Sequence, residues 1–265
     1  MAEKFYKPVG ETSFQCVERF RASRPELVGE RLSFAGRLDP MAEGEMLILI
    51  GADNDNRDAF LKMDKKYDTE FVFGIETDSF DLMGVIKEVN MNCAISGENT
   101  PGKNYNEKTT PEEISKLLLS KVGKQMQKFP PYSKRHVKGK AMFVWASEGR
   151  LDEIEIPEHE IEIYSIEITK TGKRSLSEIA NEAIQRIQNV QGDFRQEKII
   201  AGWKEILQKY SAENLEPKNQ DLEFPTISFT IKCSTGTYIR QLAQDIGKEI
   251  GCGALTYSIK RTYIG

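Results

Sequence analysis

The final stretch of the chain, PTISFTIKCSTGTYIRQLAQDIGKEIGCGALTYSIKRTYI (residues 225–264), decides the fold class. Its first ten residues alternate between apolar and polar side chains, which is typical of a half-buried strand. Residues 236–251 then carry apolar side chains at helical spacing, and Gly251 is the residue type that commonly closes a helix. A last strand is predicted from Ala254 to Ile264. Strands and a helix in such close succession indicate a sheet with helices packed on it.

The rest of the chain predicts more strands and helices. Apolar patterns favour strands at Met46 to Ile50 and 159–170, and a hairpin or meander at Thr69 to Phe73 and Gly84 to Val89. Helical spacing favours helices at 13–23, after Thr110, and twice within 171–220, which we interpret as a helical insertion between two strands. We therefore predict an α+β protein with a central, mainly antiparallel mixed sheet flanked by helices. No internal repeat is visible, and residues 1–265 are expected to form a single domain.

Composition and charge restrict the class of protein. A chain of 265 residues with 39% hydrophobic residues can bury a real core, which excludes a disordered or collagen-like chain. The formal net charge of −4 gives no general reason to expect a polyanionic partner, so a nucleic-acid site has to be a local patch. Residues 121–140 provide one, because they contain seven Lys or Arg and no acidic residue.

Several other classes lack the residues that they require. No apolar run approaches the roughly 20 residues of a membrane span, and the start of the chain does not resemble a signal peptide, so we predict a cytoplasmic protein. The four cysteines are scattered and the two histidines have no ligand spacing, which predicts no metal centre. No Gly-rich phosphate loop is present, so no nucleotide cofactor is expected.

One aspartate stands in a conspicuous loop. Asp39 follows Leu38 and precedes Pro40 in GRLDP (36–40), directly before the strand predicted at Met46 to Ile50. Its carboxylate is therefore expected to project from a constrained loop at a strand edge. An isolated Asp-Pro is more often a simple turn, so this motif alone does not make Asp39 catalytic.

Five motifs in a fixed order make the chain resemble the TruB family of tRNA pseudouridine synthases. They are YKPVGETSF (6–14), GRLDPMAEGEMLILIG (36–51), KKYDTEFVFGIETDSFDLMG (65–84), FPPYSKRHVKGKAMFVWASEG (129–149) and KCSTGTYIRQLAQDIGKEIGCGALTYSIKRT (232–262). Together they span most of residues 6–263 and leave chiefly 91–110 and 171–220 outside. One such motif could be structural, but five in order favour a functional interpretation.

The resemblance implies a pseudouridine synthase fold, with an active-site cleft across the sheet, and a set of roles. Asp39 would be the nucleophile on the target uridine, at either the sugar or the base. Tyr67 would pack on the flipped base and help to move a proton, and Arg240 would pair with Asp39. Tyr238 and Ile259 would line the base pocket. The reaction needs no metal and no organic cofactor.

The resemblance also implies an RNA partner, most simply the T arm of tRNA with its uridine at position 55. The target base has to be unstacked before it can react. Four basic residues within 121–140 are the candidate phosphate contacts: Lys134, Arg135, Lys138 and Lys140. A monomer without membrane contact is expected.

The chain departs from the family pattern at several points. A family histidine five positions before the aspartate is Phe34 here, and a family alanine is Arg37. Other pseudouridine synthase families carry arginine two residues before their aspartate, so we hypothesise that Arg37 assists base flipping. Lys134 stands where a small residue is common. The chain stops at Gly265, so we expect no C-terminal PUA-type domain, and the 171–220 insertion could replace it or serve as a scaffold.

Two alternatives to a tRNA pseudouridine synthase remain open at this point. The first is the same chemistry on another RNA, which the changes at Phe34 and Arg37 favour because they concern substrate contact. The second is a non-catalytic RNA-binding protein or tRNA-folding chaperone. The joint presence of Asp39, Tyr67 and Arg240 argues against the second, because a binding protein does not need all three.

Overall fold

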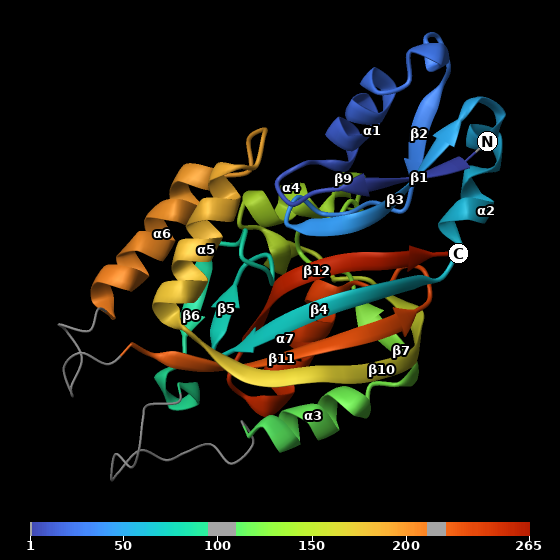
Figure 1. The fold of residues 1–265 in the computed structure, drawn as a ribbon. Helices are drawn as coiled ribbons and strands as arrows, with labels where there is room; N and C mark the ends of the chain where they lie inside the picture. Colours follow the sequence, from blue (N-terminus) through green and yellow to red (C-terminus); the bar gives the residue numbers. More distant parts are fainter. Residues whose placement is uncertain (1, 95–109, 211–220) are drawn as a thin grey trace.

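A single large sheet organises the computed structural model, which describes residues 2–94, 110–210 and 221–265 (Figure 1). Its strands run in the order β1 (Ala2–Lys7), β3 (Ala42–Ile50), β12 (Ala254–Ile264), β4 (Lys65–Phe73), β11 (Glu223–Cys233), β10 (Glu158–Ser175) and β7 (Gly123–Lys128), and β2 (Leu32–Ala35) pairs with β3. All pairs are antiparallel except β3 with β12. The predicted mainly antiparallel mixed sheet is confirmed.

The C-terminal stretch folds as its pattern predicts. β11 is followed by α7 (Ile239–Ile250), and Gly251 closes this helix with φ +81°. β12 then returns to the middle of the sheet, between β3 and β4. Gly247 allows the helix to contact this strand directly, because an added Cβ would lie 2.4 Å from the backbone nitrogen of Ala254. Helix and strand are therefore packed closely at the centre of the fold.

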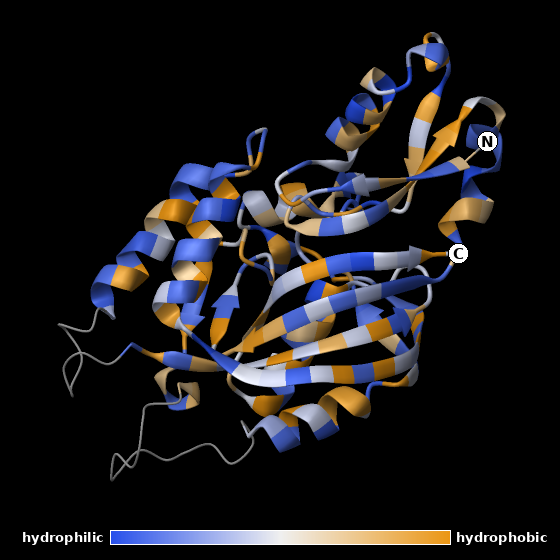
Figure 2. Ribbon diagram, in the orientation of Figure 1, coloured by the Kyte–Doolittle hydropathy of each residue, from blue (hydrophilic) through white to orange (hydrophobic). Residues whose placement is uncertain are grey.

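Helices bury the apolar sides of the sheet. Figure 2 shows the alternation of the strands as bands of blue and orange along β10, β11 and β4. α3 (Pro111–Leu119) begins at the predicted N-cap, Thr110, and packs with α7 on one large core. A second core lies under α5 (Leu176–Gln188) and α6 (Gln196–Lys209), beside the short strands β5 (Ile75–Thr77) and β6 (Ile86–Val89). α1 (Ser13–Ala22) packs on β1 and β2, and α2 (Arg57–Leu61) lies beside β2.

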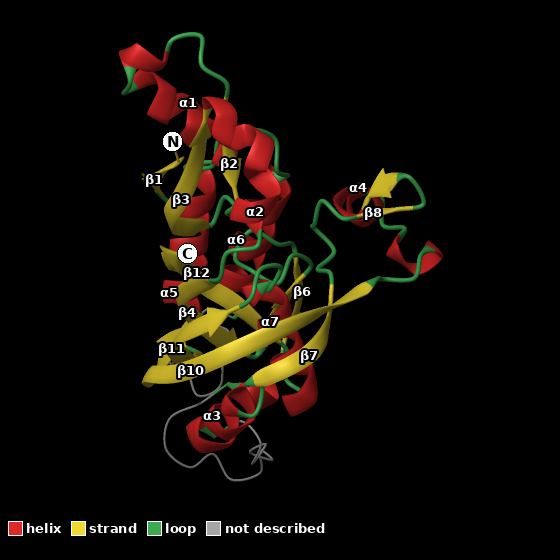
Figure 3. Ribbon diagram, turned by 90° about the vertical axis from the view of Figure 1, so that its right-hand side faces the viewer, coloured by secondary structure: helices red, strands yellow, loops and turns green. Residues whose placement is uncertain are grey.

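A small arm projects from the sheet between β7 and β10. It contains β8 (His136–Val137), β9 (Lys140–Ala141) and α4 (Met142–Ser147), and Figure 3 shows it standing to one side of the main body. This arm carries much of the basic run 121–140. Residues 132–134, at the base of the arm, lie against the main body of the protein.

Two sequence-based expectations are corrected. The hairpin or meander expected from Thr69 to Phe73 and Gly84 to Val89 is wrong, because β4 pairs with β11 and β12 whereas β6 pairs with β5. Phe71, Val72 and Phe73 are all fully buried, which suits a central strand covered on both faces. The insertion also begins later than expected, because β10 continues through residues 171–175 beside β11.

The two helices expected within 171–220 are present as α5 and α6. The polar end of that segment, residues 211–220, lies outside the described residues. Within the described part of the chain, the structure contains no helix of the length and apolarity that a membrane span requires.

Candidate active site

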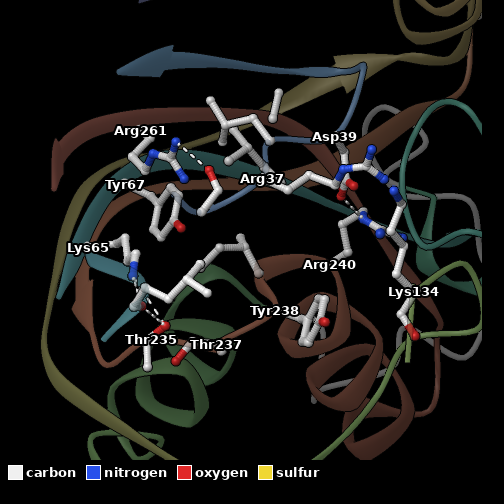
Figure 4. Close-up of a pocket in the computed structure, with 18 of the residues that line it drawn as sticks. Arg37, Asp39, Lys65, Tyr67, Lys134, Thr235, Thr237, Tyr238, Arg240 and Arg261 are labelled. Carbon is white, nitrogen blue, oxygen red and sulfur yellow. Dashed lines mark hydrogen bonds and ion pairs between the residues drawn. The ribbon is translucent and has the colours of Figure 1, made fainter. Parts of the chain in front are cut away.

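Asp39 lies at a cavity of about 390 Å³ where the central strands meet the loops around them (Figure 4). The Asp39 loop, α2, β4, β12, the residues before α7 and the base of the arm all contribute to its walls. These segments are far apart in the sequence. The cavity brings together Asp39, Tyr67, Tyr238, Arg240 and Ile259, which belong to three of the five motifs.

The loop that carries Asp39 is held by two residues of the first motif. Ser13 Oγ donates to the carbonyl oxygen of Leu38 at 2.9 Å and accepts from its backbone nitrogen at 3.1 Å. Lys7, which is fully buried, donates from Nζ to the carbonyl oxygens of Ala42 at 2.6 Å and Pro40 at 3.4 Å. Burial lowers the pKa of Lys7 to about 8, against the opposing attraction of Asp39. The loop on both sides of Asp39 is thus fixed.

Arg240 pairs with Asp39 from the first turn of α7. Its Nε lies 2.7 Å from Asp39 Oδ2, and its side chain is only 5% exposed, whereas that of Asp39 is 35% exposed. The guanidinium also donates to the carbonyl oxygens of Ser79 at 2.6 Å and Tyr132 at 3.4 Å. Arg240 is therefore buried and fixed, and it pairs with Asp39 as expected from the family resemblance.

A second carboxylate, that of Asp81, lies 3.6 Å from Arg240 Nε. Asp81 accepts hydrogen bonds from Ser79 Oγ at 2.5 Å and from the backbone nitrogen of Met83 at 3.0 Å. Burial raises the pKa of Asp81, although Arg240 opposes the shift. Burial disfavours the charge of Arg240, but Asp39 and Asp81 outweigh it and raise the arginine's pKa. Arg240 therefore bridges one accessible carboxylate and one buried carboxylate.

Tyr67 forms a buried wall of the cavity. It lies on β4 directly opposite Arg261 of β12, and Figure 4 shows the two side chains together. Burial raises the pKa of Tyr67 to about 12, and the Arg261 guanidinium opposes this. Arg261 is 1% exposed and donates to the carbonyl oxygens of Glu45 at 2.6 Å and Gly36 at 3.0 Å. At neutral pH the Tyr67 hydroxyl is protonated.

Glycine at position 44 makes room for this arrangement. Gly44 has φ +115° and pairs with Arg261 across the parallel β3–β12 contact. An added Cβ there would lie 2.1 Å from the carbonyl oxygen of Arg261, closer than any real side chain approaches. A larger residue would therefore move the strand that presents Arg261 to Tyr67.

The remaining predicted base-pocket residues, Ile259 and Tyr238, also line the cavity. Ile259 is partly buried on β12, opposite Thr69 of β4. Tyr238 precedes α7, and its backbone exchanges two hydrogen bonds with the Gln127 side chain, at 2.8 and 3.1 Å. Its ring contacts Phe129 edge-on, with the centroids 5.7 Å apart.

Of the four predicted phosphate contacts, one lines the cavity and the other three lie outside it. Lys134 lines the cavity with Arg37, and partial burial together with Arg37 and Arg57 lowers its pKa. Lys138 and Lys140 lie outside the cavity on the arm, where Lys140 pairs with Glu148 at 2.7 Å and Lys138 donates to a backbone carbonyl. Arg135 is exposed and its guanidinium lies 5.2 Å from the centre of the Phe129 ring.

Three cationic side chains, those of Arg37, Arg57 and Lys134, thus face the mouth of the cavity. Nothing in the sequence indicated that they would lie close together. Arg37 and Lys134 come from different motifs, and Arg57 joins them from α2. Among the described residues, no carboxylate forms an ion pair with any of the three. Arg57 donates from Nε to the carbonyl oxygen of Phe34 at 3.2 Å. A cationic mouth of this kind attracts phosphate groups.

Sequence reasoning missed several residues that support the site. Lys7, Ser13, Asp81 and Arg261 all lie inside the quoted motifs, so their motif membership was the available signal. What the sequence could not show was which carbonyl or carboxylate each one contacts. Within the described ranges no cluster of His, Cys, Asp and Glu has the arrangement of a metal site.

The cavity can hold a planar ring against Tyr67, with the Asp39 carboxylate in the same cavity. Asp39 is accessible enough to reach a ligand, and Arg240 orients and neutralises it. The cationic mouth can fix the phosphates on either side of an extruded nucleotide. This combination suits a reaction on a nucleotide that has been taken out of a folded RNA.

Curated relatives match almost the whole chain. The tRNA pseudouridine synthase B of Thermosipho melanesiensis is 28% identical over 260 residues, covering 98% of this chain and 62% of the relative. The enzyme of the same name from Clostridium kluyveri is 29% identical over 259 residues, covering 98% and 65%. The chain therefore spans less than two thirds of the length of these relatives.

Solved structures share the fold at low sequence identity. A Cbf5-Nop10-Gar1 complex matches with a TM-score of 0.53 and 16% identity, covering 100% of this chain and 48% of the other. An H/ACA ribonucleoprotein bound to a substrate RNA containing 2′-deoxyuridine matches with a TM-score of 0.50 and 14% identity, covering 100% and 47%. These likenesses concern the fold alone and agree with the predicted pseudouridine synthase fold.

A family model described as TruB family pseudouridylate synthase, N terminal domain, matches residues 24–192. This range contains Asp39 and Tyr67 together with the loop that holds Asp81. The match covers well over half of the chain, and the relatives extend it over the C-terminal motif that contains Arg240. The chain belongs to the TruB family of pseudouridylate synthases.

Proposed function

We propose that this protein is an RNA pseudouridine synthase that isomerises the T-loop uridine of tRNA, position 55. The observation that carries the proposal is the 2.7 Å ion pair between the accessible Asp39 and the buried Arg240, in one cavity with the ring of Tyr67. The relatives named tRNA pseudouridine synthase B support tRNA as the substrate. A tRNA substrate also supports a cytoplasmic location.

In the proposed reaction, the bond between N1 of uracil and C1′ of ribose breaks and a bond between C5 and C1′ forms. C5 loses a proton and N1 gains one, so the product is an isomer of the substrate. Asp39 is the nucleophile that holds the intermediate adduct while the base turns. Because nothing is oxidised or reduced, the proposal needs no metal and no organic cofactor.

Arg240 and Tyr67 have separate roles in this proposal. Arg240 neutralises and aims the Asp39 carboxylate, because its own position is fixed by two backbone carbonyls. Tyr67 stacks on the extruded base, and Ile259 and Tyr238 enclose it. With its pKa near 12, Tyr67 enters the reaction with its hydroxyl protonated. To accept the proton from C5, the hydroxyl oxygen therefore has to release its own proton at the same time.

The RNA contacts in the proposal start at the cationic mouth. Arg37, Arg57 and Lys134 would hold the phosphates next to the target, and Arg37 would also occupy the space that the extruded base leaves. Arg135, Lys138 and Lys140 on the arm would contact the RNA further away. The one large sheet that organises the described residues supports one catalytic domain, which we propose acts as a monomer.

A uridine in another RNA is the second candidate target. Arg37 and Lys134 both replace small residues of the family motifs, and both are exposed side chains that line the cavity. Such changes can alter the choice of RNA and leave the chemistry in place.

The proposal is tested with unmodified tRNA transcripts and total cellular RNA, followed by mapping of pseudouridine at single-nucleotide resolution. Wild-type protein should modify the T-loop uridine, and Asp39→Asn should modify nothing. A signal at another site keeps the chemistry and changes the substrate. RNA binding and annealing by both proteins, with no pseudouridine in either RNA pool, would show an RNA chaperone instead.

A further inference from the structure

The connection between α5 and α6 reaches back to the site through Arg195. This residue has φ +65° at the start of α6, a left-handed conformation that is costly for arginine and needs support from its contacts. Its guanidinium forms two hydrogen bonds to the Asp78 carboxylate, NH1 to Oδ2 at 2.7 Å and NH2 to Oδ1 at 3.3 Å. It also lies over the Tyr132 ring, 4.4 Å from its centre.

Asp78 joins three separate segments of the chain. Besides Arg195, its Oδ2 accepts a hydrogen bond from the Tyr132 hydroxyl at 2.9 Å, and its Oδ1 accepts one from the backbone nitrogen of Val85 at 2.8 Å. The loop 78–85, the base of the arm and the α5–α6 connection therefore meet at one carboxylate. A bidentate arginine pair that is also stacked on a ring has little freedom to move.

The two segments that Arg195 ties together are those that hold Arg240. Arg240 donates to the carbonyl oxygen of Ser79, the residue after Asp78, and to that of Tyr132. The same loop presents the buried carboxylate of Asp81 to Arg240.

α6 makes a second contact with this loop. The fully buried Trp203 donates from Nε1 to the carbonyl oxygen of Leu82 at 3.2 Å. The helical insertion thus fastens the loop at two places, one on each side of Asp81.

We propose that Arg195 is a positioning residue, which holds Asp78 and Tyr132 so that the carbonyls of Ser79 and Tyr132 keep Arg240 aimed at Asp39. The inference rests on the proposed function, because it concerns the reaction of Asp39. It assigns α5, α6 and their connection a scaffold role, since the guanidinium of Arg195 is already engaged by a carboxylate and is not available to a phosphate.

Charge balance gives a second reason for this role. Three carboxylates, those of Asp39, Asp78 and Asp81, lie around two guanidiniums, those of Arg240 and Arg195. Without Arg195, the Asp78 carboxylate loses its cation and adds negative charge beside the loop that holds Arg240. The unpaired Asp78 carboxylate would then attract the Arg240 guanidinium in competition with Asp39.

A matched control exists elsewhere in the fold. Arg174 also forms a two-bond pair with a carboxylate, that of Glu70 at 2.8 and 3.0 Å, and lies 4.2 Å from the centre of the Tyr257 ring. Arg195 and Arg174 have similar side-chain exposure, 29% and 25%. Among the described residues, no hydrogen bond, ion pair or ring contact joins Arg174 to the loop 78–85 or to Arg240, so Arg174→Met should cost stability without affecting the site.

The first test measures pseudouridine formation in a single turnover with enzyme in excess, together with the Kd for tRNA transcript and the Tm. Arg195→Met should slow the reaction at least tenfold with the Kd within threefold of wild type, and Arg195→Lys should recover part of the rate. Arg174→Met should stay within twofold in rate. A rate within twofold for Arg195→Met, an equal loss in Arg174→Met, or a loss confined to RNA affinity overturns the inference.

A double-mutant cycle separates positioning from general loss of stability. Arg195→Met and Tyr132→Phe both act through Asp78, so their combined effect on the rate should be at least threefold smaller than the product of the single effects. Arg174→Met and Tyr132→Phe share no partner, so their combined effect on the rate should equal the product of the two single effects. Multiplication in both pairs contradicts a shared route through Asp78.

A readout that does not need activity keeps this inference distinct from the proposed function. The Nε–H proton of Arg240, identified in NMR spectra by its loss in Arg240→Lys, should be protected from solvent exchange in the wild type by its bond to Asp39. Arg195→Met should speed this exchange at least tenfold, and Arg174→Met should not. A wild type without product on any RNA refutes the proposed function alone, whereas unchanged exchange in Arg195→Met refutes the positioning role.

Discussion

Lys7 should make stability depend on pH in a way that Lys7→Met removes. The lysine is fully buried under the Asp39 loop, and its pKa falls from 10.5 to about 8, chiefly because burial penalises the charged form. In the unfolded chain the ammonium returns to water and to its ordinary pKa. Between these two values the unfolded state binds more protons than the folded state, so stability rises with pH.

The size of this effect follows from the shift itself. A folded pKa of about 8 and an unfolded pKa of 10.5 make the contribution of Lys7 to the free energy of unfolding roughly 2 kcal/mol more favourable at pH 9.5 than at pH 7. This contribution of Lys7 to stability is complete above pH 10.5, the pKa in the unfolded chain, and is lost as the pH falls through about 8, the pKa in the folded protein. Burial also lowers the pKa of Lys65 to about 8. Lys65 is present in both the wild type and Lys7→Met, so its effect cancels in the difference between them.

The assay is urea unfolding of wild type and Lys7→Met at several pH values from 7 to 9.5. The difference in unfolding free energy between the two proteins should shift by about 2 kcal/mol in favour of the wild type across this range. Lys66→Met, at an exposed position on the same sheet, serves as the control and should give a constant difference. A difference for Lys7→Met that stays constant to within about 0.5 kcal/mol would refute the reasoning.

Three further predictions concern the reaction. Arg240→Lys replaces a fork that reaches Asp39 and two carbonyls by a single ammonium, so the single-turnover rate should fall by roughly 10²–10³ with little change in RNA affinity; a loss below tenfold contradicts the role given to Arg240. Tyr67→Phe keeps the ring that stacks and removes the hydroxyl, so the Kd for RNA should stay near the wild-type value while the rate falls roughly 10²-fold or more; an unchanged rate would exclude the hydroxyl from proton transfer. Arg37→Ala should weaken RNA binding and reduce the slope of log K against log salt by about 0.7–0.9, one phosphate contact; turnover and affinity at wild-type levels would leave Arg37 without a role.

Local patterns predicted most of the fold because they report which side of each element faces the core. The alternation within β11 and the helical spacing of α7 placed Arg240 at the start of a helix that packs on the sheet. The motif order placed Asp39, Tyr67 and Arg240 in one family pattern, and the structure brings them to one cavity. Their roles in catalysis remain predictions.

Pairings between distant segments were beyond reach of the same patterns. β4 was expected to pair with the next strand along the chain, but Phe71 and Phe73 are buried on one face and Val72 on the other, which suits the centre of the sheet instead. Periodicity identifies the face of a strand and does not identify its neighbour. The contact between Asp78 and Arg195 joins residues 117 positions apart, and no motif included the arginine.

The two cations that depart from the family pattern have a common physical explanation. The chain carries a net charge of −4, which on its own repels RNA. At physiological salt, charges act over only about 8 Å, so what an approaching phosphate experiences is the set of nearby side chains. Arg37 and Lys134 replace small residues in two motifs that lie far apart in sequence, and the fold places both beside Arg57 at the mouth of the cavity. In the proposed function, each added charge therefore strengthens the attraction for phosphate at the mouth of the cavity, where the target nucleotide has to enter.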